Sequence, residues 1–244
     1  MNYYILPFFA LAPSTIWLLF YLHKDRHPES KKMIVRVFAY GVAATIPAAA
    51  LEVLLEPKLA LLPLSPLFIS GIYFFVVVGM TEEIFKYLAA RESVFASSEL
   101  DEPLDVMLYM IISALGFAAL ENLLYLLQQC AGEFAAALCQ ESFFQNSVAL
   151  TIQRFVGATF LHALTSGTFG YFVALSFSRP KFKWIFFLTG LFLASVLHGL
   201  FNFSIMEVAG LGKLIIPVGI LIGLAISTSW GFQLLKRMPN KCNI

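Results

Sequence analysis

Charged residues are scarce in this chain. Asp, Glu, Lys and Arg together make up 13% of its 244 residues, whereas hydrophobic residues make up 59%. A soluble domain has roughly 25% charged and 45–50% apolar residues, so this composition excludes an ordinary water-soluble fold. The chain also lacks a polar block long enough to fold separately. We therefore expect a single membrane-embedded domain over residues 1–244.

The chain also lacks a strong charge imbalance and has few cysteines. Its net charge is +1, and its basic residues are scattered over short predicted loops, which argues against a nucleic-acid partner. Two of the three cysteines, Cys130 and Cys139, fall in the longest predicted outer loop, and Cys242 falls in the predicted inner tail. A disulfide between the first two and a pair of free thiols remain equally good interpretations of this spacing.

Long apolar runs extend along the whole sequence. Each is about twenty residues long, which is enough for a helix to cross roughly 30 Å of hydrocarbon. The runs are continuous rather than alternating, which indicates helices and not barrel strands. The fold class that we predict is all-α, a polytopic membrane protein with about seven transmembrane helices. The predicted spans are residues 3–22, 34–55, 67–90, 104–127, 148–177, 184–206 and 211–235.

The distribution of basic residues predicts the orientation in the membrane. One set of predicted loops contains eleven Lys and Arg residues, and the other set contains only Lys58 and Lys213. The positive-inside rule then places the N-terminus outside and the C-terminus inside. The first apolar run has no basic segment before it and no small-residue cleavage site after it. We expect it to remain as a span rather than to be removed as a signal peptide.

Polar residues inside predicted spans are the best indicators of function, because a charge at mid-bilayer costs about 2.5–3.5 kcal/mol on insertion scales. The first group is Glu82, Glu83 and Lys86. Glu82 and Lys86 are four residues apart and are expected to pair, whereas Glu83 points about 100° away and stays available. Two carboxylates could divide the roles of acid and base in hydrolysis. Alternatively, the group caps the third span at its cytoplasmic end.

Three further groups lie in the following spans. Glu121 and Tyr125 share one face of the fourth span, and Asn122 lies beside them. They are either part of a site or polar residues that hold packed helices together. Arg154 and His162 share a side of the fifth span, although Arg154 could simply extend to the membrane surface. His198 and Asn202 share a face of the sixth span. Convergence of these groups on one wet cavity is simpler than several independent packing accidents.

Counting residues along ideal helices conflicts with a single site. Glu82 and His162 fall about 21–22 Å below the outer boundary, whereas Glu121, Arg154 and His198 fall about 9–12 Å below it. Helix tilts or kinks would remove the difference. Otherwise Glu121 and Arg154 form a separate structural pair.

The ordered set of motifs resembles that of the PrsW family of intramembrane proteases, which is similar to the type II CAAX prenyl endopeptidases within one superfamily. The resemblance covers a core of about residues 67–206 and keeps the order of the motifs. These are Glu82-Glu83-x-x-Lys86, Gly116-Phe117-x-x-x-Glu121-Asn122-x-x-Tyr125, His162 in the next span, and His198-x-x-x-Asn202.

The resemblance implies hydrolysis of a peptide bond in or near the membrane, with Glu82, Glu83, His162 and His198 as catalytic positions. It also implies that His198 and Asn202 stabilise the oxyanion. The implied partner is a membrane protein or peptide substrate, such as an anti-sigma factor cut on its outer side. The implied location is the plasma membrane of a prokaryote. Because the superfamily also contains non-catalytic scaffolds, a scaffold remains an alternative.

On this basis we expect Glu82 or Glu83 to activate water with help from His162. Zinc is the alternative, with His162, His198 and Glu121 as candidate ligands. The sequence has no His-Glu-x-x-His motif, and Lys86 lies beside the carboxylates, which favours a reaction without a cofactor. A proton-coupled transporter or channel is the other alternative, but no inverted repeat relates the two halves of the chain.

Overall fold

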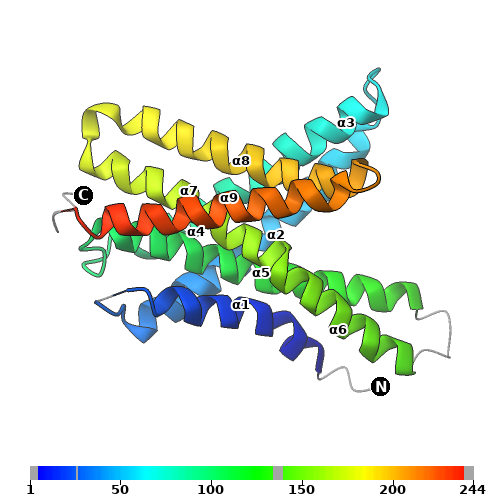
Figure 1. Ribbon diagram of the computed structural model, residues 1–244, viewed down its shortest axis with the longest axis horizontal. Coiled ribbons are helices and arrows are strands. Elements are labelled where there is room, and N and C mark those ends of the chain that lie inside the picture. The colour runs from blue at the N-terminus through cyan, green and yellow to red at the C-terminus, as the bar shows by residue number, and fades with distance from the viewer. Residues whose placement is uncertain (1–4, 26, 134–139, 239–244) are drawn as a thin grey trace.

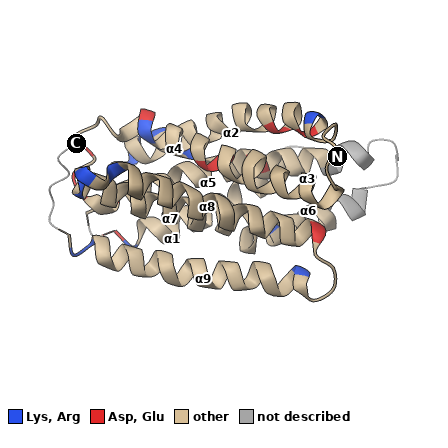
Figure 2. Ribbon diagram, turned by 90° about the horizontal axis from the view of Figure 1, so that it is seen from above, with Lys and Arg blue, Asp and Glu red and all other residues tan. Residues whose placement is uncertain are grey.

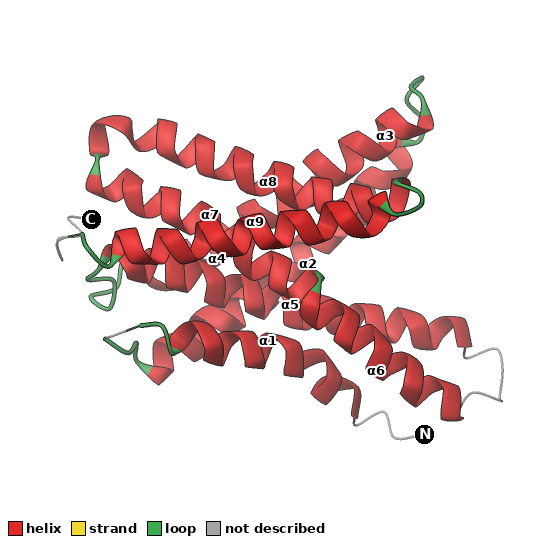
Figure 3. Cartoon of the chain, in the orientation of Figure 1, coloured by secondary structure: helices red, strands yellow, loops and turns green. Residues whose placement is uncertain are grey.

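The computed structural model describes residues 5–25, 27–133 and 140–238. Within these ranges the chain forms helices and no strand, which confirms the all-α prediction (Figure 3). Cys139, Cys242 and the side chain of Cys130 lie outside what is described, so the disulfide question stays open.

The helices follow one another with short connections. In chain order they are α1 (Leu6–Leu22), α2 (Lys31–Leu59), α3 (Pro66–Ile72), the π-helix η2 (Tyr73–Met80), α4 (Thr81–Val94), α5 (Pro103–Glu133), α6 (Gln140–Val156), α7 (Ala158–Ser178), the 3₁₀-helix η3 (Pro180–Phe182), α8 (Lys183–Glu207) and α9 (Gly212–Leu235). Six helical segments of the described chain are long and apolar enough to cross a membrane, and α1 is a shorter apolar helix of 17 residues. The protein is therefore a polytopic membrane protein.

Local chemistry explains several helix boundaries. The Ser30 hydroxyl accepts a hydrogen bond from the Met33 amide at 3.3 Å and caps the start of α2. Pro66 and Pro103 each stand at the first position of a helix, where the missing N–H has no intrahelical role. Gly210 has a φ of +65° in the turn between α8 and α9, a conformation that favours glycine.

Helix α5 runs through the middle of the bundle (Figure 1). It packs against α1, α2, α4, α6, α7 and α9. Its residues Val106, Leu108, Ile111 and Leu115 are completely buried, which explains why this span is apolar on all sides. The outer helices instead expose large apolar side chains such as Phe192 of α8. This is the distribution expected of a bundle surrounded by lipid.

The two ends of the bundle differ in charge. Lys and Arg residues are concentrated at the end where α9 finishes, and α1 begins at the opposite end (Figure 2). This asymmetry is the one from which the sequence analysis predicted an inward C-terminus, and the orientation itself stays a prediction.

Two irregular backbone segments depart from the predicted continuous spans. In the third predicted span, residues Tyr73–Met80 form a π-helix that ends two residues before Glu82. In the fifth, Gly157 interrupts the helix with φ −103° and ψ −98° and separates α6 from α7. The sequence predicted a single span over each of residues 67–90 and 148–177. Such irregular backbone is tolerated inside a membrane protein where neighbouring helices satisfy the freed polar groups.

Candidate active site

A partly open cavity of about 870 Å³ lies between α2, α3, η2 and α4 to α8. Its lining includes most of the residues that the sequence singled out: Glu82, Glu121, Tyr125, Arg154, His162, His198 and Asn202. Glu83 and Lys86 are not part of the lining, and both are completely buried. The four sequence motifs therefore meet in one place, as expected.

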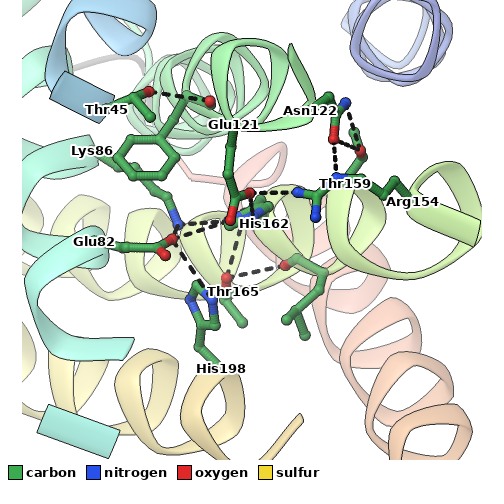
Figure 4. A network of polar contacts seen from close by, with 12 residues as sticks. Thr45, Glu82, Lys86, Glu121, Asn122, Arg154, Thr159, His162, Thr165 and His198 are labelled. Atoms are coloured by element: carbon green, nitrogen blue, oxygen red, sulfur yellow. Dashed lines mark hydrogen bonds and ion pairs between the residues drawn. The ribbon is translucent and has the colours of Figure 1, made fainter. Parts of the chain in front are cut away.

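Glu82 is the member of the carboxylate pair that faces the cavity. Its Oε2 accepts a hydrogen bond from Lys86 Nζ at 3.0 Å and lies 3.5 Å from Nδ1 of His162 (Figure 4). The side chain is only 3% exposed. Its other oxygen, Oε1, makes no hydrogen bond within the described residues. One oxygen of this carboxylate is thus held in place, and the other can accept a hydrogen bond from a guest molecule.

Glu83 is fully engaged by the protein. Its Oε1 is contacted by Lys86 Nζ at 2.9 Å, by the Thr165 hydroxyl at 3.0 Å and by His198 Nδ1 at 3.0 Å. Its Oε2 accepts a hydrogen bond from the Ser166 hydroxyl at 2.6 Å. The expectation that Glu83 stays available while Lys86 pairs with Glu82 alone is therefore wrong. Lys86 reaches both carboxylates because spacings of three and four residues share one face of a helix.

His162 has both ring nitrogens occupied. Nδ1 lies 2.7 Å from Lys86 Nζ, and Nε2 lies 2.8 Å from Glu121 Oε2. An ammonium group can only donate, so Nδ1 accepts and Nε2 carries the proton that is donated to Glu121. The contacts therefore assign a neutral imidazole to His162. In this arrangement His162 supports Lys86 and Glu82 and has no free nitrogen for a water molecule.

Arg154 anchors the other side of Glu121. Its Nη2 donates to Glu121 Oε2 at 2.6 Å, and its Nε donates to the Asn122 side-chain oxygen. The guanidinium lies 4.2 Å from the centre of the Tyr125 ring. Arg154 is 7% exposed, so the interpretation that it extends to the membrane surface is wrong. It belongs to the network around the cavity.

Asn122 links this network to α1. Its amide nitrogen donates to the Ala10 carbonyl at 3.1 Å and to the Thr159 hydroxyl at 3.2 Å. All the hydrogen-bonding groups of Asn122 point to the protein, and its side chain is buried. Asn122 is thus a residue that positions Arg154 and the start of α7.

His198 and Asn202 enter the cavity from α8. Nδ1 of His198 contacts Glu83, whereas Nε2 lies 3.7 Å from Glu82 Oε2, beyond hydrogen-bond distance. Asn202 lines the cavity and makes no side-chain hydrogen bond within the described residues. The Asn202 amide can therefore present a donor to a guest molecule, and His198 presents its second ring nitrogen, Nε2.

Three of these side chains also form a donor set for a metal ion. Glu82, His162 and His198 each offer one ligand atom, and these atoms lie within 4.8 Å of one another. Two imidazoles and a carboxylate are typical ligands of catalytic zinc, and a carboxylate on the second nitrogen of each imidazole is typical of its surroundings. Glu121 and Glu83 occupy those second positions. The carboxylate of this group is Glu82, in place of the Glu121 that the sequence analysis named.

Lys86 contacts the candidate metal ligands. Its ammonium group is 3.0 Å from Glu82 Oε2 and 2.7 Å from His162 Nδ1, so it contacts two of the three candidate ligands. A divalent cation at these atoms would face this positive charge at close range. The ligand types therefore fit zinc, but the ammonium group competes with it.

The predicted difference in depth between two groups of residues does not occur. His162 contacts Glu121 at 2.8 Å, and Nε2 of His198 lies 3.7 Å from Glu82 Oε2, although the residue count placed the members of each pair about 10 Å apart in depth. The count assumed straight, unbroken helices of equal tilt. The π-helix before Glu82 and the break at Gly157 invalidate that assumption.

Sequence reasoning missed several residues of the site. Thr165 and Ser166 follow His162 by three and four residues, and this spacing on one helix face could have indicated that they share its surroundings. Glu52 of α2 also lines the cavity. It lies within the second predicted span, where its cost in lipid is the same signal that identified the other glutamates.

Comparison with known proteins assigns the chain to one protein family. Residues 29–230 match the model of a family described as PrsW family intramembrane metalloprotease. The chain is 25% identical to Protease PrsW of Bacillus subtilis over 234 residues, which cover 93% of this chain and 91% of the relative. It is 28% identical to Protease PrsW of Geobacillus kaustophilus over 203 residues, covering 81% of this chain and 78% of the relative. It is 23% identical to Protease PrsW of Oceanobacillus iheyensis over 213 residues, covering 87% and 88%. No solved structure matches the chain.

Proposed function

The chain belongs to the PrsW family of intramembrane proteases, and on that premise we propose that it hydrolyses a peptide bond in or beside the membrane segment of a protein substrate, with Glu82 as the general base. The observation that supports this role is the asymmetry of the glutamate pair. Glu82 lines the cavity, and its Oε1 makes no hydrogen bond within the described residues. Both oxygens of Glu83 are instead hydrogen-bonded to other side chains.

Glu82 is suited to accept the proton of a water molecule. Oε2 is fixed by Lys86, which leaves Oε1 to bind the water in the cavity. As the water oxygen attacks the substrate carbonyl, its proton moves to Glu82, and the same proton can then pass to the leaving amine. The Lys86 charge limits the cost of two carboxylates in a buried site. His162 supports this step because its Nδ1 accepts a hydrogen bond from Lys86 Nζ and so keeps the ammonium group in position.

His198 and Asn202 are suited to stabilise the negative charge that develops on the carbonyl oxygen. Glu83 holds Nδ1 of His198 at 3.0 Å, which orients the ring so that Nε2, when protonated, can donate to the oxyanion. The Asn202 amide offers a second donor from the next turn of α8. In this proposal Glu83 is a positioning residue that acts through His198.

The residues that would hold zinc, if the enzyme uses it, are Glu82, His162 and His198. Zinc would supply a Lewis acid that lowers the pKa of a bound water molecule. Because Lys86 competes for two of these ligands, we favour the reaction without zinc. In either case Glu121 orients the His162 ring and Glu83 orients the His198 ring.

The proposed substrate is a membrane protein with one span, for which an anti-sigma factor is the example that the family resemblance supplies. The charge asymmetry supports cleavage on the outer side of a bacterial plasma membrane, because the cavity is lined by the α2–α3 connection at the end that has few basic residues. The family assignment favours this proposal over a transporter or channel. A non-catalytic scaffold is the alternative that the next experiment separates.

The test uses single-residue variants expressed in a bacterial membrane together with a tagged single-span anti-sigma factor. We expect Glu82→Gln to lower cleavage at least about 100-fold, because general base catalysis typically contributes 10²–10⁴-fold. The amount of protein in the membrane should not change. Glu92→Gln is the matched control, since that side chain is 63% exposed and forms a surface ion pair with Arg91. Full activity of Glu82→Gln would refute the proposed mechanism, and a uniformly inactive parent protein would favour the scaffold.

A further inference from the structure

Helix α2 contributes a carboxylate to the cavity that the proposed reaction does not use. Glu52 and Glu56 are four residues apart on one face of α2, and both line the cavity that contains Glu82. Oε1 of Glu52 is shielded from solvent and has no hydrogen-bond partner within the described residues. A carboxylate oxygen in that position is costly unless a donor reaches it. The donor is therefore to be sought in a molecule that enters the cavity.

The buried cations Lys86 and Arg154 cannot supply it. Lys86 is bound by Glu82, Glu83 and His162, and Arg154 is bound by Glu121 and Asn122. None of the ion pairs in the described ranges involves Glu52 or Glu56.

A third carboxylate, Glu207 at the end of α8, also lines the cavity, and its one described hydrogen bond is with the neutral Ser70 hydroxyl at 2.6 Å. This part of the cavity wall thus carries several acidic groups with no basic partner in the described chain.

We propose that Glu52 is a specificity residue that binds a Lys or Arg side chain of the substrate, on the side of the scissile bond that faces the α2–α3 connection. The inference rests on the proposed function, because it assumes that the cavity receives a peptide. Glu52 lies seven residues before the end of α2, or about 10 Å along the helix axis. A long basic side chain can lay its apolar stem along Leu59 and Ile69, which also line the cavity, and place its charge at Glu52.

A cation explains the cavity wall better than a neutral donor does. A peptide N–H could satisfy one oxygen of Glu52, but it would leave the charge of Glu56 and Glu207 uncompensated. A full positive charge is attracted by all three groups in a site of low dielectric constant. The rings of Tyr73 and Tyr125 also line the cavity and can contact a cation. Substrates with a basic residue on this side of the cut are therefore expected to bind most tightly.

Binding can be measured separately from hydrolysis. The Glu82→Gln protein is placed in nanodiscs of zwitterionic lipid with fluorescent single-span peptides. In one set a single Lys moves residue by residue along the half of the span nearer the α2–α3 connection, and in the matched set Gln replaces it. We expect the Lys peptide at the best position to bind at least about tenfold more tightly, since hydrogen bonds to charged groups are worth about 1.5–3 kcal/mol.

Two variants assign this preference to Glu52. Glu52→Gln should reduce it to less than about twofold, and Glu52→Lys should favour a Glu peptide over the Lys peptide. Glu92→Gln, on an exposed side chain, should leave it unchanged. Equal binding of Lys and Gln peptides at every position, or a preference that persists in Glu52→Gln, would overturn the inference. Cleavage of the Gln peptide by the protein with Glu82 intact would then still support the proposed function, so the two failures are distinguishable.

Discussion

Glu121 and His162 contact each other through Oε2 and Nε2 at 2.8 Å, which joins the centre of α5 to the start of α7. The same oxygen of Glu121 binds Arg154 at 2.6 Å. One carboxylate thus fixes the tautomer of the imidazole and neutralises a buried guanidinium. These two roles have different consequences when Glu121 is changed, and they can be separated.

We predict that Glu121→Ala destabilises the protein by about 3–5 kcal/mol, because it leaves Arg154 as an unpaired buried charge. The double variant Glu121→Leu/Arg154→Met should recover most of that stability, since an apolar pair can replace a buried ion pair. It should not recover cleavage, because His162 loses its partner. Thermal unfolding in detergent and cleavage of the proposed single-span substrate measure the two effects. A fully active double variant would show that Glu121 and Arg154 form the separate structural pair that the residue count allowed.

A second prediction concerns the contact between η2 and α8. A Cβ added to Gly199 would lie 2.7 Å from the Phe74 carbonyl oxygen and 2.7 Å from the Phe75 Cα. Gly199→Ala must therefore push α8 away from η2, at a cost of about 1–3 kcal/mol. Because His198 is the adjacent residue, the contact with Glu83 should lengthen and cleavage should fall by more than the amount of folded protein does.

Gly223→Ala on α9 is the matched control for Gly199→Ala. Apart from the adjacent backbone of α9 itself, no atom lies within 4 Å of the added Cβ at that position. The substitution should leave cleavage unchanged and stabilise the helix by up to about 1 kcal/mol. Equal activity of the two alanine variants, at equal amounts of folded protein, would mean that the close approach at Gly199 has no role in the site.

The sequence predicted which residues meet, but not how they divide their work. Glu82, Glu121, His162 and His198 were identified because a charged or imidazole side chain in a membrane span is costly and needs a reason. That argument works residue by residue and needs no knowledge of the packing. It could not tell Glu82 from Glu83, because a helical repeat shows which residues share a face but not which of them faces a cavity.

The helices were predictable to the same extent. Composition and apolar runs were sufficient for the all-α membrane fold and for the approximate spans, because lipid requires long uninterrupted apolar segments. The π-helix before Glu82 and the break at Gly157 were not predicted. The π-helix packs against α8, where Gly199 approaches Phe74, and neither irregularity has a signal in the apolar runs. Without them, counting residues along straight helices placed the site residues at two depths.

A third prediction concerns α1, which lies outside the residues that match the family model. The Trp17 Nε1–H donates to the Phe155 carbonyl at 2.9 Å, just before the break at Gly157. The indole ring also stacks on Phe155, before the break, and on Phe160, after it, with ring centres 5.3 Å and 4.0 Å apart. Trp17 therefore holds together the two helix ends that carry Arg154 and His162.

Trp17→Phe keeps an aromatic ring but removes the N–H. We expect a loss of about 1–3 kcal/mol in stability, because a carbonyl in the membrane interior loses its donor. Cleavage by the folded fraction should fall as well, since Arg154 and His162 lie on opposite sides of the break. Trp230→Phe is the control, as that indole is 64% exposed on α9 and should be replaceable without effect. If the Trp17→Phe protein is active and equally stable, the contribution of α1 to the site would be limited to the contact between the Ala10 carbonyl and Asn122.

The last prediction decides whether the site works with zinc. Lys86 contacts Glu82 Oε2 and His162 Nδ1, two of the three atoms that a zinc ion would need. If its ammonium group is part of the working site, the purified protein should contain less than stoichiometric zinc and should keep its activity after treatment with a strong chelator. Lys86→Met removes the competing charge and frees both ligands. This variant should bind zinc more tightly than the parent protein does.

A zinc-dependent enzyme would give the opposite result. One zinc ion per chain in the parent protein, lost in His162→Ala and needed for cleavage, would make Glu82 a ligand rather than the base. Glu121→Gln would then also weaken zinc binding, by about 10–100-fold, because it removes the charged partner of the His162 ring. In a zinc-free site the same substitution alters cleavage and leaves metal content at background. Metal content and cleavage of the His162→Ala and Glu121→Gln proteins therefore identify the role of Lys86. Its charge either balances the carboxylates during hydrolysis or must move away when the ion binds.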